Sequence, residues 1–301
     1  MLQIKHFSLR FSLYGKGLEQ RDLEVISSLD VDIKAGELVS IIGSSGSGKS
    51  LLAHAVLGIL PANAHLSGEL YYQGQALTKK ALEKLRGREI ALIPQSVTYL
   101  DPTMKVGKQV MGVRHDAADV EAVFRRYKLP ASVMDKYPFE LSGGMARRIL
   151  VSAAVIAGAK LIIADEPTPG LSETLAKEAL AHLRELADMG CGVMLITHDI
   201  TLALEVSDRI SIFYSGLTLE TALRRDFEDG GRSLRHPYTR ALWKALPQND
   251  FSPLPGFQPY AGTVTEQCAF FPRCTMATEE CLHPIPMRDL RDGKVRCIHA
   301  A

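Results

Sequence analysis

The pattern of apolar and polar positions divides the first part of the chain into short strands. Residues 3–11 and 25–33 are strand-like and are separated by a polar turn rich in Gly, Lys and Glu. Residues 38–42 form a continuous apolar run, which predicts a strand buried on both faces. The segment 51–60 then predicts a helix. The N-terminal region therefore combines half-exposed strands with one buried strand that leads into a helix.

Farther along the chain, strands and helices alternate in the order typical of a parallel sheet. Apolar runs at 161–164 and 192–196 enclose a helical stretch at 173–189, which is the β–α–β order of parallel strands. Shorter strands are expected at 68–72 and 89–94. We predict an α/β fold, with an irregular helical region between its strands.

Composition changes after about residue 230, where prolines crowd a short stretch and four cysteines follow. We predict a core domain at 1–230, with a helical subdomain at about 96–158. A separate Pro- and Cys-rich C-terminal module is predicted at 231–301.

Bulk properties exclude several classes of protein. The 301 residues include 35 basic and 34 acidic side chains, a net charge of +1, which gives no indication of nucleic-acid binding. No apolar run approaches the roughly 18 residues of a membrane span, and the N-terminus lacks the apolar segment of a signal peptide. We expect a cytosolic protein that reaches a membrane only through a partner.

The octet GSSGSGKS fits the phosphate-loop pattern G-x-x-x-x-G-K-[ST] between a buried strand and a helix. Glycines allow a tight turn whose backbone amides face an anion, and the helix N-terminus adds partial positive charge. Lys49 is expected to reach the β- and γ-phosphates, and Ser50 to bind Mg²⁺. The residues predicted to bind nucleotide here are Gly43, Ser44, Ser45, Gly46, Ser47, Gly48, Lys49 and Ser50. The octet predicts nucleoside triphosphate binding.

Two acidic residues end the apolar strand at 161–164. Asp165 is expected to hold the Mg²⁺ shell, and Glu166 to act as general base toward the attacking water. A strand that simply ends in solvated acids is the alternative. The phosphate loop on the same chain favours the functional interpretation.

A second anion site is predicted at Ser142-Gly143-Gly144, just before a helix. One chain needs one such site per triphosphate, so a second site suits a nucleotide held by another subunit. These motifs resemble the ATP-binding cassette (ABC) family, in the same order over residues 2–246. The resemblance makes residues 142–144 the signature loop and Gln95 the glutamine that senses Mg²⁺. His198 becomes the switch histidine that contacts the γ-phosphate.

The resemblance also implies an aromatic residue that stacks on adenine, with Phe11 as first choice and Tyr14 as second. The chain departs from the family at two points. Arg147 belongs to a signature that continues without the glutamine often found there, and Ser172 replaces the usual aspartate. The second change suggests a heterodimer in which the two nucleotide sites differ.

Two further segments resemble oligopeptide, dipeptide and nickel importers: QSVTYLDP, which begins at Gln95, and HPYTRAL, which begins at His236. The cysteines Cys268, Cys274, Cys281 and Cys297 follow, as in the same importers. This resemblance implies a [4Fe–4S] cluster. Spacing alone does not distinguish it from Zn²⁺, and unligated cysteines are the remaining alternative.

The resemblance implies an ATPase subunit that powers import of peptides or nickel, with ATP and Mg²⁺ as ligands. Its partners would be a second, non-identical ATPase subunit, two membrane permeases and, indirectly, an extracytoplasmic binding protein, with no nucleic acid. Its place would be the cytoplasmic face of the inner membrane. Two alternatives remain: a non-transport ABC ATPase, and an ATPase governed by a metal or redox site at the cysteines.

Overall fold

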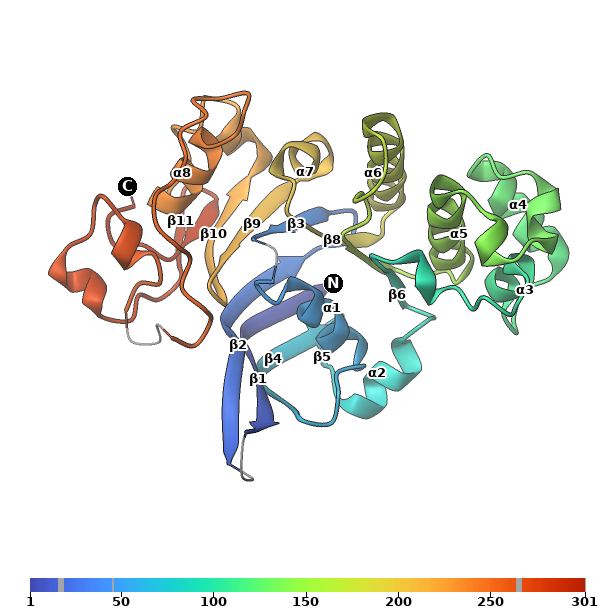
Figure 1. Ribbon diagram of the computed structural model, residues 1–301, viewed down its shortest axis with the longest axis horizontal. Helices are drawn as coiled ribbons and strands as arrows, with labels where there is room; N and C mark the ends of the chain where they lie inside the picture. The colour runs from blue at the N-terminus through green and yellow to red at the C-terminus, as the bar shows by residue number, and fades with distance from the viewer. Residues whose placement is uncertain (16–18, 45, 264–266, 301) are drawn as a thin grey trace.

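The computed structural model describes residues 1–15, 19–44, 46–263 and 267–300. Strands in these ranges form a 12-stranded sheet through the middle of the molecule, with the helical region at one end and the C-terminal region at the other (Figure 1). Its main path runs β5-β4-β1-β2-β10-β9-β3-β8-β7-β6. The predicted ABC-type α/β fold is confirmed in its core.

The central strands are parallel and buried, as the continuous apolar runs predict. They are β3 (Leu38–Ile42), β6 (Ile90–Ile93), β7 (Leu161–Asp165), β8 (Gly192–Thr197) and β9 (Arg209–Tyr214). Every residue of β3, β7 and β8 is buried. Three helices pack on these strands: α1 (Lys49–Leu57), α6 (Glu173–Asp188) and α7 (Ile200–Val206).

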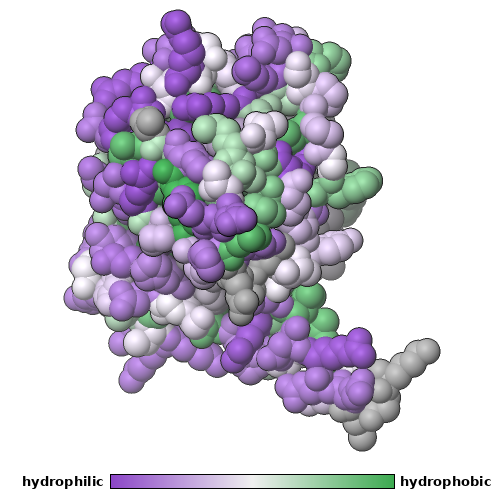
Figure 2. Space-filling model, turned by 90° about the vertical axis from the view of Figure 1, so that its left-hand side faces the viewer, coloured by the Kyte–Doolittle hydropathy of each residue, from purple (hydrophilic) through white to green (hydrophobic). Residues whose placement is uncertain are grey.

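An antiparallel layer forms the other part of the sheet. It contains β1 (Leu2–Tyr14), β2 (Gln20–Ile33), β4 (Ala64–Tyr72) and the two-residue β5 (Gln75–Ala76), with α2 (Lys79–Leu85) after it. The hairpin of β1 and β2 projects from the body of the molecule (Figures 1 and 2). The strands expected at 3–11, 25–33 and 68–72 are confirmed, each somewhat longer than expected.

Helices α3 (Val106–Met111), α4 (Ala117–Arg126) and α5 (Gly143–Ile156) gather at one end of the molecule (Figure 1). Asp116 caps α4 by accepting a hydrogen bond from the Asp119 amide, and Ser142 caps α5 by accepting one from the Met145 amide. All three helices fall within the interval 96–158. The limits of the helical subdomain stay a prediction. No helix in the described ranges is long and apolar enough to span a membrane.

The C-terminal region is continuous with the core. After β10 (Leu217–Leu223) come α8 (Pro237–Lys244), β11 (Arg288–Leu290) and β12 (Gly293–Val295), and β12 pairs with β10. Phe270 packs in one hydrophobic cluster with Ile42 and Ile210 of the central strands. The structure therefore does not confirm a separate module, and the predicted boundary at 230/231 remains untested.

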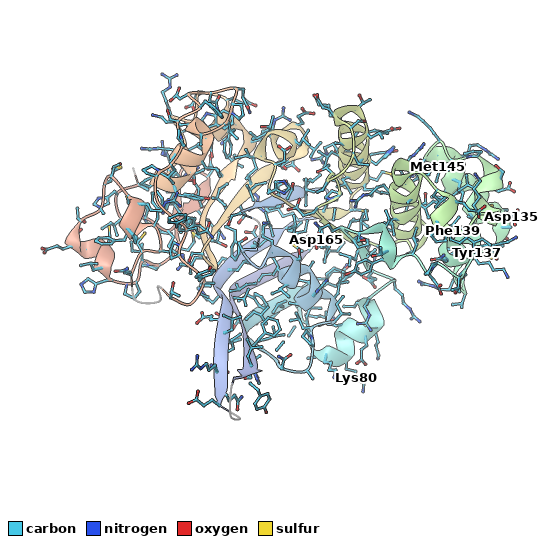
Figure 3. All side chains as sticks on the ribbon, viewed as in Figure 1. Lys80, Asp135, Tyr137, Phe139, Met145 and Asp165 are labelled. Carbon is cyan, nitrogen blue, oxygen red and sulfur yellow. The ribbon has the colours of Figure 1, made fainter. Side chains whose placement is uncertain are left out.

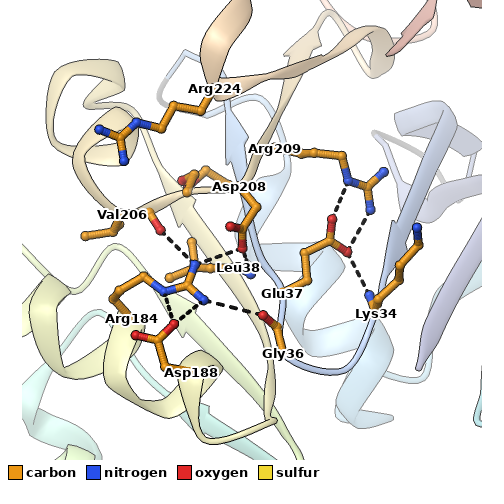
Figure 4. Close-up of polar contacts among 12 residues, drawn as sticks. Lys34, Gly36, Glu37, Leu38, Arg184, Asp188, Val206, Asp208, Arg209 and Arg224 are labelled. Atoms are coloured by element: carbon orange, nitrogen blue, oxygen red, sulfur yellow. Dashed lines mark hydrogen bonds and ion pairs between the residues drawn. The ribbon is translucent and has the colours of Figure 1, made fainter. Parts of the chain in front are cut away.

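Arg184 on α6 ties together three segments around the start of β3 (Figure 4). Its guanidinium donates to Asp188 and Asp208, each at 2.8 Å, and to the carbonyls of Val206 and Gly36. Asp208 in turn accepts from the Leu38 amide at 2.8 Å. This network fixes the end of β3 opposite the phosphate loop.

A buried ion pair attaches the C-terminal region to the sheet. Arg235 is 1% exposed and Glu220 on β10 is fully buried, with 3.4 Å between Nη1 and Oε1. The same nitrogen lies 2.7 Å from Asp226, and Nε donates to the Leu290 carbonyl at 2.7 Å. Glu220 also accepts from the backbone amides of Arg235 and His236, both at 2.8 Å. Both the Arg235 guanidinium and the Glu220 carboxylate therefore have several hydrogen-bond partners.

We expect Arg235→Met to destabilise the protein by about 3–5 kcal/mol, because it leaves Glu220 buried without its cation. Urea denaturation followed by circular dichroism measures this. Arg225→Ala is the control: its pair with Asp292 is exposed, so its cost should stay under about 1 kcal/mol. Equal effects of the two substitutions would contradict the role of the buried pair.

Candidate functional site

The predicted site residues follow the ends of four neighbouring parallel strands. Ile42 of β3 pairs with Thr197 of β8, Ile196 pairs with Asp165 of β7, and Ala164 pairs with Ile93 of β6. The residues that come next on each strand are therefore brought to one edge of the sheet: Gly43, His198, Glu166 and, after Pro94, Gln95. In open α/β sheets, ligands bind at this carboxyl edge.

The phosphate loop connects β3 to α1 and uses glycine where other residues would be strained or would clash. Gly46 and Gly48 have φ of +78° and +92°, in the left-handed region. A Cβ at Gly48 would also lie 2.8 Å from Cγ1 of Val25, and one at Gly43 would lie 2.7 Å from the carbonyl oxygen of Phe213. Ser45, also predicted to bind nucleotide, lies outside the described residues.

Lys49 folds back over the loop. Its Nζ donates to the carbonyls of Gly43 and Ser44, both at 2.8 Å, and the residue is only 5% exposed. Burial lowers the pKa of Lys49, while the nearby carboxylates of Glu166 and Asp165 oppose that change. The ammonium group therefore lies between the loop and two acids, where an anionic ligand would meet it.

Ser50 and Asp165 are brought together as predicted for a Mg²⁺ site. The Ser50 hydroxyl donates to Oδ1 of Asp165 at 3.0 Å. Burial raises the pKa of Asp165, and the hydrogen bond from Ser50 opposes this. One carboxylate and one hydroxyl suit Mg²⁺, which usually takes its remaining ligands from water and substrate phosphates.

Glu166 and His198 form a pair across the ends of β7 and β8. His198 Nδ1 lies 2.9 and 3.0 Å from the two carboxylate oxygens of Glu166. Glu166 is buried and has φ of +45°, a strained value for a residue with a side chain. Its amide donates to the Ile196 carbonyl at 2.8 Å, which helps to hold this conformation. Strain of this kind is common at functional sites.

Gln95 lies exposed in a bend after β6. The carbonyl before it, that of Pro94, accepts from Arg147 of α5 at 3.0 Å, and Arg147 also reaches the Pro169 carbonyl at 3.5 Å. Arg147 therefore joins the signature helix to the strand ends that carry Gln95 and Glu166. The sequence marked this arginine only as a departure from the family pattern.

The predicted signature loop lies away from the rest of the site. Ser142 caps α5 and Gly143 and Gly144 begin it; Ser142 and Gly143 are exposed and Gly144 is half-buried. Figure 3 shows Met145, the next residue, within the helical region, whereas Asp165 lies at the centre of the molecule. The structure thus does not bring the signature loop together with the phosphate loop of the same chain.

Ser172 lies at the start of α6 and caps it, since its hydroxyl accepts from the Leu175 amide at 3.5 Å. It keeps a capping oxygen where the family usually has an aspartate, but without the charge.

The aromatic residues predicted to stack on adenine do not line the cavity beside the phosphate loop. Phe11 is on β1, opposite Leu23 and Ala64, and packs against the hydrophobic core. Tyr14 is 75% exposed at the end of β1. The described residues that line the cavity come instead from β2, the phosphate loop, the β9–β10 turn and the segment 258–261. Beyond a proline-rich stretch, nothing in the sequence indicated that segment 258–261 contributes to this cavity.

The C-terminal cysteines lie near one another without forming a metal site. Burial and, to a smaller extent, the charges of Cys281, Cys297 and Cys274 raise the pKa of Cys268 to about 11. Where the structure describes the chain, no group of three or more His, Cys, Asp or Glu side chains is arranged to hold a metal ion. The structure therefore does not support the expected [4Fe–4S] cluster.

Fold and site together define a P-loop ATPase of the ATP-binding cassette class. The backbone resembles the dimeric ATP-binding cassette MJ0796 in a post-hydrolysis state bound to ADP and Pi, with a TM-score of 0.65, 24% identity and coverage of 75% of this chain and 100% of that one. Residues 26–169 match the family model for ABC transporters. Residues 224–281 match the model for the C-terminal region of oligopeptide/dipeptide transporters.

Curated relatives match over nearly the whole chain. The oligopeptide transport ATP-binding protein OppD of Escherichia coli is 32% identical, covering 98% of this chain and 92% of the relative. The dipeptide transport ATP-binding protein DppD of the same organism is also 32% identical, covering 99% and 96%. The chain belongs to the oligopeptide/dipeptide group of ABC transporter ATPases.

We expect Asp165→Asn to stabilise the nucleotide-free protein while weakening Mg²⁺-dependent ATP binding. Because the pKa of Asp165 is raised in the fold above the ordinary 3.8, stability falls as the pH rises through the range between the two values. The carboxylate charge thus costs stability at pH 7, and its removal should raise Tm by roughly 2 °C. Asp250→Asn, on an exposed side chain, is the control and should leave Tm unchanged. A lower Tm for Asp165→Asn would contradict this expectation.

Proposed function

We propose that this chain hydrolyses ATP to power peptide import through partner permeases. The observation that carries the proposal is the convergence of Lys49, Asp165, Glu166 and His198 beside the phosphate loop. The relatives are named as oligopeptide and dipeptide transport proteins, which supports peptides as the substrate class. None of these relatives is named as a nickel transporter.

In the proposed reaction, water attacks the γ-phosphorus, the bond to the β–γ bridging oxygen breaks, and ADP and phosphate leave. Glu166 accepts the proton of the attacking water, and His198 orients that carboxylate from 2.9 Å. Lys49 and the loop amides stabilise charge on the phosphoryl oxygens. Ser50 and Asp165 would hold Mg²⁺, which neutralises phosphate charge when bound.

A second ATPase subunit completes the site in this proposal. The amides of the exposed Gly143 and the half-buried Gly144 lie at the N-terminus of the 14-residue helix α5, away from Asp165 (Figure 3). They are free to bind the triphosphate held by a partner. The uncharged Ser172 supports a non-identical partner, because contacts made through this residue would differ from those through an aspartate.

The permeases would dock in a groove of about 490 Å³ between the sheet and the helical region. Its lining is mainly apolar and includes Tyr99 and Val113, which are 58% and 100% exposed. Tyr99 lies four residues after Gln95, so a partner in the groove would contact the segment next to the nucleotide site. The chain would then act as a peripheral subunit at the cytoplasmic face of the membrane.

A non-transport ABC ATPase is the second candidate. It would use the same nucleotide site, so hydrolysis does not separate the two functions. Association with permeases does separate the two functions, and a substitution in the groove tests for that association.

We expect Glu166→Gln to lower the ATPase kcat by about 10²–10⁴-fold, because the amide cannot accept the proton of water. ATP affinity should remain close to that of the wild type. Phosphate release and ATP titration measure the two effects. Glu173→Gln, on an exposed side chain of α6, serves as the matched control. Normal turnover in Glu166→Gln would contradict the proposed mechanism.

We expect Val113→Asp to reduce co-purification of membrane permeases at least about tenfold, since docking would remove water from a charge placed on a mainly apolar surface. Affinity purification of the tagged subunit from membranes measures this. Phe251→Asp, which adds a charge at an exposed apolar residue in the C-terminal region, should leave the yield unchanged. Wild-type protein that recovers no permease would favour the non-transport function.

A further inference from the structure

Arg147 on α5 is a buried arginine that has no acidic partner among the described residues. It is 8% exposed, and its guanidinium donates to two backbone carbonyls, that of Pro94 at 3.0 Å and that of Pro169 at 3.5 Å. Burial lowers the pKa of Arg147. The buried Arg235, by contrast, is paired with two carboxylates. A buried charge without a counterion lowers the stability of a fold, which points to a role in function.

Both acceptors are proline carbonyls, and each belongs to a segment that carries a residue of the nucleotide site. A proline has no N–H, so the carbonyl is its only backbone hydrogen-bonding group, and its ring fixes φ. The Pro94 carbonyl is part of the planar peptide group that leads into Gln95. The hydrogen bond from Arg147 therefore fixes the direction in which the chain enters Gln95.

The second carbonyl lies in the loop between β7 and α6. A backbone hydrogen bond of 3.1 Å closes the turn 168–171, and Gly170 has φ of +79°, as in a type II turn with proline at its second position. The Pro169 carbonyl takes no part in that closing bond, so it is available to Arg147. The turn begins two residues after Glu166, whose φ of +45° is strained. Arg147 therefore restrains the loop that leaves this strained residue.

The same helix carries the signature loop. Gly143 and Arg147 are four residues apart on α5, so they lie on the same face of the helix. A Cβ on Gly144 would lie 3.4 Å from Cδ1 of Leu175, in the first turn of α6, so the start of α5 packs closely on the start of α6. The guanidinium thus joins three parts of the site that come from distant stretches of sequence: α5, the bend after β6 and the loop after β7.

A planar guanidinium suits two acceptors that belong to different segments. Nη1 and Nη2 of Arg147 carry separate N–H groups in a fixed fork, and each nitrogen donates to one of the two carbonyls. The neighbouring Arg148 donates to two carbonyls just after α4, within the helical region. Arg126 of α4 pairs with Glu185 at 2.6 Å, in the last turn of α6. Neither of these arginines contacts the carbonyls that Arg147 binds.

We propose that Arg147 is a positioning residue of the ATPase reaction: it holds the bend at Gln95 and the loop after Glu166 in the relative arrangement that hydrolysis requires. The inference deepens the proposed ATPase function and rests on it. Because both partners of Arg147 are carbonyls, its N–H donors do the positioning and its charge does not. Neither hydrogen bond reaches the phosphate loop, so Arg147 should affect turnover more than ATP binding.

Arg147→Met tests the proposal, because it removes the N–H donors and keeps an unbranched side chain that can fill the space. The chain is purified from membranes with the subunits that accompany it. The ATPase kcat should fall by about 10- to 100-fold, since a small displacement of catalytic groups can cost about 10²-fold. The KM for ATP should stay within about twofold of the wild type, as expected when only turnover is affected.

Two further variants show which property of Arg147 matters. Arg147→Gln keeps two N–H donors on a neutral side chain, and it should recover kcat to within about fivefold of the wild type. Arg126→Gln is the matched control, because it removes an arginine that links the helical region to α6 without contact to either loop. It should leave both kcat and KM unchanged.

Several results would overturn the inference. Arg147→Met with the wild-type kcat would show that the reaction does not depend on this arginine. Parallel losses of kcat, ATP affinity and Tm would assign Arg147 a general structural role. Equal losses in Arg147→Met and Arg147→Gln would exclude the hydrogen bonds as the cause. Wild-type protein that hydrolyses no ATP would overturn the proposed function itself, which distinguishes that failure from results in which only the variants change.

Discussion

The register of the four parallel strands β3, β8, β7 and β6 is the constraint on which the site depends. Backbone ladders align Ile42 with Thr197 and Asp165 with Ile196, so the residues after each strand meet at one edge. A slip of one residue would turn every side chain of a strand to the opposite face of the sheet. Because β3, β7 and β8 are buried throughout, such a slip is strongly disfavoured. The sheet therefore positions the functional groups without requiring contacts among all of them.

The groups so positioned work against the stability of the fold. Asp165 and Glu166 are both buried, burial raises the pKa of the first, and the second has a left-handed backbone. Lys49 supplies a nearby cation, but its ammonium group donates hydrogen bonds to carbonyls of the phosphate loop and not to these acids. A protein selected for stability alone would not need such residues, so their presence together at one edge of the sheet is a sign of function.

The sequence predicted the parts of this structure whose causes are local. The apolar run at 38–42 gives β3 with the same limits, and the octet after it forms the expected loop between strand and helix. The pairing of Ser50 with Asp165 follows from strand order, so it too could be anticipated. Arg147 could not be assigned, because its contacts with Pro94 and Pro169 depend on how α5 packs on the sheet.

The features of the C-terminal region were also hard to predict, because they too depend on contacts between residues far apart in the sequence. The pairing of Glu220 with Val295 joins residues far apart in the sequence, and a three-residue strand leaves almost no periodic signal. Four cysteines in a short segment suggested a metal site, yet the described part of the chain has no group of three or more side chains arranged to hold a metal ion. Spacing specifies how many ligands are available and says little about where their side chains point.

Strand β10 explains how the C-terminal region comes to lie beside the phosphate loop. Within this strand, Glu220 binds Arg235 and fixes the start of that region. Next to its other end, Ser215 receives the segment that carries Tyr260. The segment between these two attachments is therefore anchored on a strand whose neighbour, β9, pairs directly with β3, the strand that leads into the phosphate loop. Attachment at both ends keeps Gln258 within hydrogen-bond distance of Ser44, so the C-terminal region lies against the phosphate loop rather than apart from the core.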